Sequence, residues 1–275
     1  AHVCVDPLCS MTGSEELLTD LKKNGQESER SACLGLCANA PAVFFQGKQC
    51  PDYAMADGDL GPSLQTISKG DQLLKRVGRI DPTSLSSYKN SGGYEALSIA
   101  IKMGPAAVID LVTESGLTGR GGAGFPTGAK WAAVAAESTD VKYIVANADE
   151  SEPGTFKDRV IMESDPFALI EAMTIAGVTV GAKTGWIYIR AEYPLAIQRV
   201  STALDKARRA NLLGNKVLHS HYSFDIEVRK GAGAYICGEE TALFSSIEGY
   251  RGEPRSKPPY PTTSGLFGRP TVVNN

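Results

Sequence analysis

The sequence predicts an α/β fold in which a Rossmann-like α/β sandwich follows a small cysteine-bearing domain. Three features lead to this prediction. Helical patterns alternate with short strand patterns from residue 93 onward, which is typical of a sandwich built on a parallel sheet. Residues 116–131 read GLTGRGGAGFPTGAKW, with six glycines in sixteen residues. Four of the six cysteines lie within the first forty residues, away from both patterns.

Length and composition set the limits. A chain of 275 residues that is 42% hydrophobic has room for two domains and an ample core. A net charge of −3 and the lack of a basic run argue against a nucleic-acid binder. The longest apolar stretch, residues 168–182, is too short for a membrane span, and no leader peptide is visible. We expect a cytoplasmic protein, and a fragment of a longer polypeptide.

Residues 1–60 are predicted to form the first domain. We expect a strand over 2–5, a helix over 14–23 capped by Ser14, and a buried strand over 42–46. The wholly polar stretch 25–30 leaves little to form a further strand before Cys33. Residues 61–92 are rich in Pro, Gly, Ser and Asp and are interpreted as a linker, with one helix near 72–77.

The early cysteines are spaced as two close pairs. Cys4 and Cys9 form C-x4-C, and Cys33 and Cys37 form C-x3-C after 23 intervening residues. Four thiolates in two pairs suit a [2Fe–2S] cluster or a tetrahedral zinc ion. Zinc sites more often use C-x2-C, so the wider gaps favour iron–sulfur. Zinc and four inert buried thiols remain alternatives.

The glycine-rich stretch is interpreted as a loop that holds a phosphate or a nucleotide. Glycines let the backbone approach a ligand and turn its N–H groups toward phosphate oxygens. Gly119, Gly121 and Gly124 satisfy G-x-G-x-x-G, but residues 105–115 before them have a helical pattern. An ordinary Rossmann turn, which requires a preceding strand, is therefore not expected.

The second domain is predicted over residues 93–275. Helices are expected over 94–103, 105–115, 128–137, 166–178 (capped by Asp165) and 194–211, and strands over 142–146, 185–190 and 224–229.

Two further polar stretches follow predicted strands. Asp149, Glu150 and Glu152 come directly after the 142–146 strand, where open α/β sheets bind ligands, although a solvated acidic turn is the alternative. Residues 231–243, GAGAYICGEETAL, form a second glycine run, and a capped helix start explains their two Glu residues equally well. Residues 251–275 contain five prolines and three glycines and look too irregular for a core element.

The motifs resemble those of a known family. GRGGAGFPTGAKW, NADESEPGTFKDR, GAGAYICGEE and the closing KPPYP and VVNN resemble, in order, the flavin- and NADH-binding subunit of respiratory complex I. The same family includes diaphorase subunits of NAD-reducing hydrogenases and NAD-dependent formate dehydrogenases. C-x4-C followed by CLGLCANAP resembles the thioredoxin-like [2Fe–2S] ferredoxin domain of these complexes, although the spacer between the pairs is shorter than usual.

The resemblance implies an FMN site with NADH stacked on the flavin. Carried over position by position, the implied FMN residues are Gly119, Arg120, Gly121, Gly122, Lys130, Asn147, Asp149, Glu150, Tyr235, Gly238, Glu239, Asn274 and Asn275. The implied NADH residues are Phe125, Glu152, Glu240, Lys257 and Tyr260. Ala132 and Ala133 stand where the family carries a second aromatic residue after Trp131.

The implied activity is that of a diaphorase module, which exchanges a hydride between NAD(H) and FMN and passes single electrons to iron–sulfur clusters. Such chemistry needs no acid–base residue, which agrees with only three histidines, all outside the motifs. The fused ferredoxin-like domain favours a soluble hydrogenase or formate dehydrogenase assembly, with its other subunits as partners and no membrane span. The family's [4Fe–4S] domain is expected beyond Asn275.

Two alternatives come from other functional classes. A non-catalytic scaffold would be colourless, and a zinc-stabilised nucleotide-binding module would contain zinc without iron.

Overall fold

The computed structural model describes residues 1–5, 7–31, 40–44, 54–55 and 73–275. The chain divides into one unit of residues 1–66 with 151–157 and a second of residues 67–150 with 158–275. The first unit contains β1 (His2–Cys4), α1 (Pro7–Met11), α2 (Ser14–Lys23), β2 (Glu29–Ser31), β3 (Ala42–Phe44) and β4 (Ala54–Met55).

The N-terminal unit has a four-stranded sheet in the order β2-β1-β3-β4. β1 runs parallel to β2 and antiparallel to β3, which is in turn antiparallel to β4. Leu18 of α2 packs on Val3 and Val43. Two expectations were wrong here: the polar stretch does yield β2, because its backbone pairs with β1, and Gly13 rather than Ser14 is the N-cap of α2.

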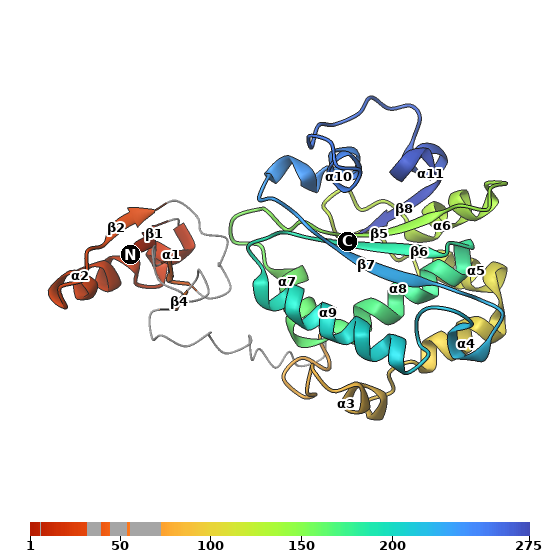
Figure 1. Ribbon diagram of the computed structural model, residues 1–275, viewed down its shortest axis with the longest axis horizontal. Coiled ribbons are helices and arrows are strands. Elements are labelled where there is room, and N and C mark those ends of the chain that lie inside the picture. Colours follow the sequence, from red (N-terminus) through yellow and green to blue (C-terminus); the bar gives the residue numbers. More distant parts are fainter. Residues whose placement is uncertain (6, 32–39, 45–53, 56–72) are drawn as a thin grey trace. The chain divides into compact units, whose positions relative to one another are not determined.

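The second unit is an α/β sandwich around a wholly parallel sheet, which confirms the predicted fold class (Figure 1). Its strands are β5 (Tyr143–Ala148), β6 (Thr184–Ile189), β7 (Asp225–Lys230) and β8 (Thr271–Asn274), in the order β7-β6-β5-β8. The helices are α3 (Leu85–Asn90), α4 (Glu95–Met103), α5 (Pro105–Glu114), α6 (Thr127–Ala136), α7 (Lys157–Ser164), α8 (Pro166–Val180), α9 (Pro194–Arg209), α10 (Glu240–Ile247) and α11 (Pro261–Ser264). Three short 3-10 helices are η2 (Val217–His219), η3 (Tyr235–Gly238) and η4 (Leu266–Gly268).

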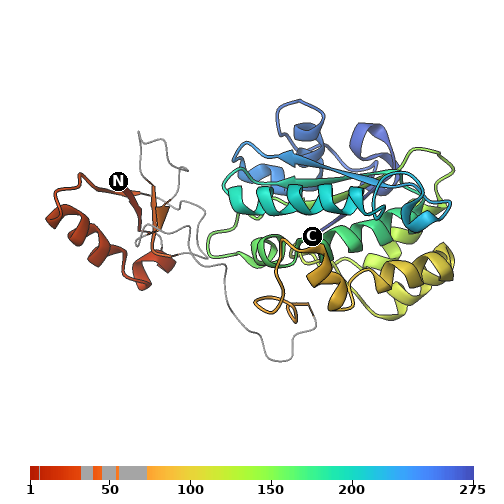
Figure 2. The ribbon, with the colours of Figure 1, turned by 60° about the horizontal axis from the view of Figure 1, so that its bottom comes forward.

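Each face of this sheet supports its own apolar core, because successive side chains of a strand point to opposite faces. Ile144 and Ala146 of β5 join a large core with α4, α5, α6, α8 and α9. Val145 joins a smaller core with α10 and η4 on the other face. Figures 1 and 2 show α8 and α9 on one side of the sheet and α10 on the other. The continuous apolar runs of β5 and β6 follow from burial on both faces.

The strand order places a switch point between β5 and β8. From β5 the chain moves outward to β6 and β7, then returns to pair β8 with the opposite edge of β5. Ala146 of β5 is level with Asn274 of β8, so both strands end side by side. Ligands of open α/β sheets bind outside the carboxyl ends of strands at such a point.

A buried carboxylate fixes the helices that precede the glycine loop. Glu171 of α8 accepts hydrogen bonds from the Tyr88 hydroxyl at 2.6 Å and from the backbone N–H groups of Tyr94 at 2.7 Å and Leu97 at 3.0 Å. Tyr94 is the N-cap of α4 and supplies no cap with its own side chain. Glu171 therefore caps α4 from a neighbouring helix.

Most predicted elements of this unit are present within three residues of the expected bounds, and the exceptions have physical causes. Residues 73–77 form turns where a helix was expected. The expectation that residues 251–275 contain no core element was wrong, because they include β8, whose Val272 and Val273 are buried. Asp165 is the N-cap of α8, but its carboxylate pairs with Arg76 at 2.7 Å instead of capping the helix. α3, α7 and α11 were not predicted.

Among the described residues, none of the helices alone has both the length and the apolar character to cross a membrane. α4 and α5 together have the required length and apolar character, but the two helices are bent by 116° where they meet.

Replacing Glu171 with Leu leaves three buried donors without their acceptor. Because each unsatisfied buried group costs about 1–3 kcal/mol, we expect the free energy of unfolding to fall by about 3 kcal/mol. Urea unfolding measures the change. The matched control is Glu114→Leu at the exposed end of α5, which should alter stability by less than about 0.5 kcal/mol. Equal effects of the two substitutions would contradict the capping role.

Candidate functional site

The glycine-rich stretch forms a closed loop between α5 and α6. Its base is held by hydrogen bonds from the Gly119 N–H to the Phe125 carbonyl and from the Thr127 N–H to the Leu117 carbonyl, both 2.9 Å. Gly122 has a φ of 102° and Gly124 has a φ of 62°, and residues other than glycine rarely adopt such positive φ angles. The loop is thus a short hairpin that leads directly into α6.

The tip of this loop has backbone donors to offer. Within the part of the chain that the structure describes, the N–H groups of residues 120–124 donate to no protein acceptor. Arg120, at the start of the tip, is exposed. A run of such N–H groups beside a guanidinium is suited to binding an anion such as a phosphate.

The loop approaches the end of β8 so closely that a side chain at one of its positions would displace the side chain of Asn275. A Cβ added to Gly121 would lie 2.4 Å from Oδ1 of Asn275. A Cβ on Gly119 would lie 3.9 Å from Nδ2 of Asn274. Glycines were expected to let the loop backbone approach a ligand closely. Here Gly121 also lets the loop approach the protein's own residue Asn275, which follows β8.

Three asparagines join the strand ends to the surrounding loops. Asn275 donates from Nδ2 to the carbonyl of Asn147 at 3.2 Å. Asn147 at the end of β5 donates from Nδ2 to the Gly238 carbonyl at 2.8 Å, and its Oδ1 accepts from the Asp149 N–H at 3.2 Å. Asn274 accepts a long hydrogen bond from the Trp131 indole at 3.4 Å. These bonds bring all three predicted motifs together.

Lys130 of α6 extends across the same region. Its Nζ donates to the Val273 carbonyl of β8 at 2.7 Å and lies 5.5 Å from the centre of the Phe125 ring. Burial lowers the pKa of the Lys130 ammonium, and the nearby carboxylate of Glu240 opposes that shift. The lysine fixes α6 to β8 and places a positive charge beside an aromatic ring.

A second charged group lies at the start of α10. Glu239 is the N-cap, and its Oε2 accepts from the N–H groups of Thr241 at 2.8 Å and Ala242 at 2.9 Å. Lys257 donates to Glu239 at 3.1 Å and to Glu240 at 2.7 Å. Burial acts to lower the pKa of Lys257, but its hydrogen bonds and charge pairing with Glu240 and Glu239 raise it. Glu239 therefore caps α10, as one interpretation of the sequence predicted. It also lines the cavity described next, as the other interpretation requires.

These parts enclose a cavity of about 800 Å³ at the ends of β5 and β8, a volume within the range of small-molecule sites. Two of its aromatic rings are unusually exposed, Phe125 at 53% and Tyr260 at 61%. Its lining comprises Gly119, Gly121, Ala123, Gly124, Phe125, Lys130, Asn147, Gly238, Glu239, Glu240, Lys257, Tyr260, Pro261, Thr262, Thr271, Val273, Asn274 and Asn275.

Twelve of the residues implied by the resemblance line this cavity, namely Gly119, Gly121, Phe125, Lys130, Asn147, Gly238, Glu239, Glu240, Lys257, Tyr260, Asn274 and Asn275. Arg120, Gly122, Asp149, Glu150 and Tyr235 do not line it. Asp149 is nevertheless adjacent, since a Cβ on Gly238 would lie 3.6 Å from its Oδ2. Whether each of these residues binds a cofactor stays a prediction.

Glu150 has a structural role that could not be predicted from its position in the motif. Its carboxylate accepts from the N–H groups of Asp158 at 2.9 Å and Arg159 at 3.1 Å, and from the Tyr193 hydroxyl at 3.2 Å. It therefore binds the first turn of α7 and the start of α9. Its backbone carbonyl also accepts from Arg190.

Other predicted residues belong to the N-terminal unit. Glu152 is an exposed residue of the 151–157 segment, and its assignment to NADH stays a prediction. Cys4 and Cys9 are buried in one apolar cluster with Ala42. Cys33 and Cys37 lie outside the described residues. In the described ranges no group of three or more metal-binding side chains occurs.

The sequence reasoning missed six lining residues. Ala123 and Gly124 belong to the glycine run that was singled out, so that run was the available signal. Pro261 and Thr262 of α11 and Thr271 and Val273 of β8 carry no comparable signal. The place of Thr271 and Val273 depends on the pairing of β8 with β5.

Comparison with known proteins adds an independent finding. Residues 112–275 match the family described as the Nuo51 FMN-binding domain. The chain is 53% identical over 201 residues to NADP-reducing hydrogenase subunit HndC of Solidesulfovibrio fructosivorans, covering 73% of this chain and 41% of that protein. It is 51% identical over 214 residues to an NADH-quinone oxidoreductase subunit of Aquifex aeolicus, covering 78% and 50% respectively.

Solved structures agree with these relatives. A crystal structure of NAD+-reducing [NiFe]-hydrogenase in the air-oxidized state matches with a TM-score of 0.73 and 30% identity, covering 100% of this chain and 50% of that one. The chain spans about half the length, or somewhat less, of the relatives that it matches.

The pH dependence of stability tests the contacts of Glu239. Partial burial acts to raise its pKa, but hydrogen bonds from Thr241, Ala242 and Lys257 lower it below the ordinary 4.5. A depressed carboxyl pKa stabilises the folded state above 4.5, and this contribution is lost as the pH falls through the folded value. We expect the stability difference between wild type and Glu239→Gln to shrink below pH 4.5. Urea unfolding across this range measures it, and parallel curves would contradict these contacts.

Proposed function

The chain belongs to the Nuo51 FMN-binding domain family, and from this premise we propose that it is the diaphorase module of an NAD-linked oxidoreductase complex. One observation carries the proposal: a single cavity of about 800 Å³ at the β5–β8 switch point, lined by all three predicted motifs. When bound there, FMN supplies hydride exchange with NAD(H) and one-electron transfer to iron–sulfur clusters.

The loop and the strand ends are suited to hold FMN. The N–H groups of residues 120–124 and the Arg120 guanidinium offer donors to its phosphate. A side chain at position 121 would displace the side chain of Asn275, which lines the cavity. The other FMN residues proposed from the motif are Gly119, Gly122, Lys130, Asn147, Asp149, Glu150, Tyr235, Gly238, Glu239, Asn274 and Asn275.

NADH is proposed to enter on the side of the exposed rings. Phe125, at 53% exposure, offers a face for stacking, and Tyr260 offers a second ring with a hydroxyl. Glu240 and Lys257 form an ion pair at 2.7 Å whose remaining hydrogen-bonding capacity suits ribose hydroxyls and a carboxamide. Glu152 completes the set proposed from the motif.

The protein's contribution is orientation rather than proton transfer. His2, His219 and His221 are absent from the cavity lining, and its two glutamates are engaged by Lys257. Fixing two planar ring systems in contact lowers the entropic barrier to hydride transfer without an acid or a base.

The N-terminal unit is proposed to carry a [2Fe–2S] cluster. Cys4 and Cys9 are buried in one cluster with Ala42, so two of the four proposed ligands lie close together, as a shared metal centre requires. A βαβ unit followed by antiparallel strands, in the order β2-β1-β3-β4, supports a thioredoxin-like domain. We propose a hydrogenase or formate dehydrogenase assembly as its setting, with a [4Fe–4S] cluster in a further part.

A visible absorption spectrum of the chain loaded with FMN, recorded before and after anaerobic addition of NADH, tests the proposal. We expect the oxidised flavin bands to bleach and ferricyanide to restore them. Flavin that binds but stays oxidised would contradict the enzyme function. Failure to retain any flavin would favour the non-catalytic scaffold.

Removing the ring of Phe125 should weaken NADH binding. Because loss of base stacking costs about 1–3 kcal/mol, we expect Phe125→Ala to raise the KM for NADH at least about fivefold while FMN content is unchanged. Steady-state NADH–ferricyanide kinetics measure the effect. Tyr250→Ala is the matched control, since Tyr250 is 73% exposed and does not line the cavity. An unchanged KM for Phe125→Ala would contradict the proposal that the Phe125 ring stacks on NADH.

Substituting Cys4 tests the cluster. We expect Cys4→Ala to lose iron and acid-labile sulfide together with the EPR signal of the reduced protein, because a cluster needs all four thiolates. Cys237→Ala is the control, since that buried thiol lies in the other unit, in η3. Wild-type protein that contains zinc without iron would overturn the iron–sulfur assignment.

A further inference from the structure

Residues 251–260, RGEPRSKPPY, which we call the strap, link α10 to α11. The strap contains no helix or strand, yet Lys257 and Tyr260 within it line the cavity. Irregular backbone of this kind has no ladder of its own hydrogen bonds, so its place depends on contacts with its neighbours.

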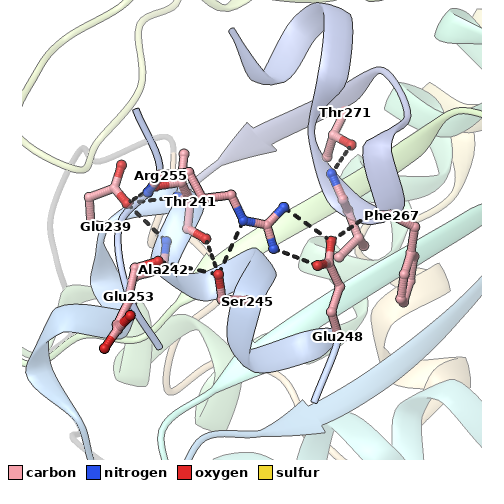
Figure 3. A network of polar contacts seen from close by, with 10 residues as sticks. Glu239, Thr241, Ala242, Ser245, Glu248, Glu253, Arg255, Phe267 and Thr271 are labelled. Carbon is pink, nitrogen blue, oxygen red and sulfur yellow. Dashed lines mark hydrogen bonds and ion pairs between the residues drawn. The ribbon is translucent and has the colours of Figure 1, made fainter. Parts of the chain in front are cut away.

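Arg255 makes those contacts along one face of α10 (Figure 3). Its backbone N–H donates to Oγ1 of Thr241 at 2.8 Å, and its Nε donates to Oγ of Ser245 at 3.2 Å. Its two terminal nitrogens reach Glu248, at 2.5 Å and 3.4 Å. Thr241, Ser245 and Glu248 are spaced i, i+4 and i+7, which places them in one row on the helix.

Glu248 joins this row to a second segment. Its side chain is only 10% exposed, and its Oε1 also accepts from the backbone N–H of Phe267 at 2.7 Å. Phe267 belongs to η4, which leads into β8 and the pocket asparagines. One carboxylate thus anchors both the strap and the approach to β8.

The row also reaches the pocket through Thr241. The Thr241 hydroxyl donates to Oε2 of Glu239, while its oxygen accepts from the Arg255 N–H. Ser245 in turn donates to the Glu253 carbonyl at 3.2 Å. Arg255 therefore fixes the strap at a point two residues before Lys257, where the chain turns toward the cavity.

We propose that Arg255 and Glu248 are positioning residues for the nicotinamide nucleotide: their ion pair seats the strap on α10 and so sets Lys257 and Tyr260 at the cavity. This inference rests on the proposed function of the pocket, although the seating itself concerns only contacts within the chain. Neither residue lines the cavity, so the effect on the nucleotide is indirect.

The test compares Arg255→Met with Arg251→Met. Arg251 is in the same strap, but it is 88% exposed and pairs with Glu253. Because a partly exposed ion pair contributes up to about 1 kcal/mol, we expect Arg255→Met to raise the KM for NADH about fivefold. The kcat and the FMN content should stay within about twofold, as expected for a loss of uniform substrate binding. Arg251→Met should match wild type.

Hydrogen exchange of the strap amides, measured without nucleotide, gives a second readout that does not depend on activity. We expect faster exchange over residues 251–260 in Arg255→Met, and a milder change in Glu248→Gln, whose amide oxygen can still accept from Phe267. Arg255→Lys should recover part of both effects, and it serves if Arg255→Met does not fold. Unchanged exchange with unchanged KM, or equal effects of Arg251→Met, would overturn the proposal. If wild type itself fails to oxidise NADH, the proposed function fails while the exchange data still decide on the seating.

Discussion

The parallel pairing of β5 with β8 is the constraint on which the candidate site depends. It places Asn147, Asn274 and Asn275 side by side at the carboxyl ends of two strands that are far apart in sequence. Their side-chain amides then bind the η3–α10 turn and limit how the glycine loop can approach. Without this pairing, the three motifs would not line the same cavity. The cavity is thus a consequence of strand order as much as of motif chemistry.

The charged side chains around the cavity are held by partners within the chain. Lys257 is shared by Glu239 and Glu240, while Lys130 is held by a strand carbonyl beside an aromatic ring. Partner contacts of this kind keep side chains in fixed positions, which suits a site that orients a cofactor rather than moving protons. The Arg255–Glu248 pair extends the same principle to the strap, outside the cavity itself.

The sequence predicted the motifs and most of this framework, because those signals are local. The apolar run of β5, the helix before the glycine loop and the glycine-rich loop itself can all be recognised within short windows. β8 could not, since four residues in a proline-rich segment become a strand only by pairing with β5. Glu150 was assigned by its motif alone, and its bonds to α7 and Tyr193 depend on distant residues. The contact of Gly121 with Asn275 likewise spans most of the domain and has no local signature.

A titration of FMN into the flavin-free chain, monitored through the quenching of flavin fluorescence, tests the central claim most directly. One pocket built from converging turns predicts saturable binding of one FMN per chain. It also predicts much weaker binding by Gly121→Val, because the added side chain would displace Asn275 and stand at the wall of the cavity. Thermal unfolding verifies that the variant is folded. Absence of saturable binding by wild type, or undiminished binding by a folded Gly121→Val variant, would contradict the account.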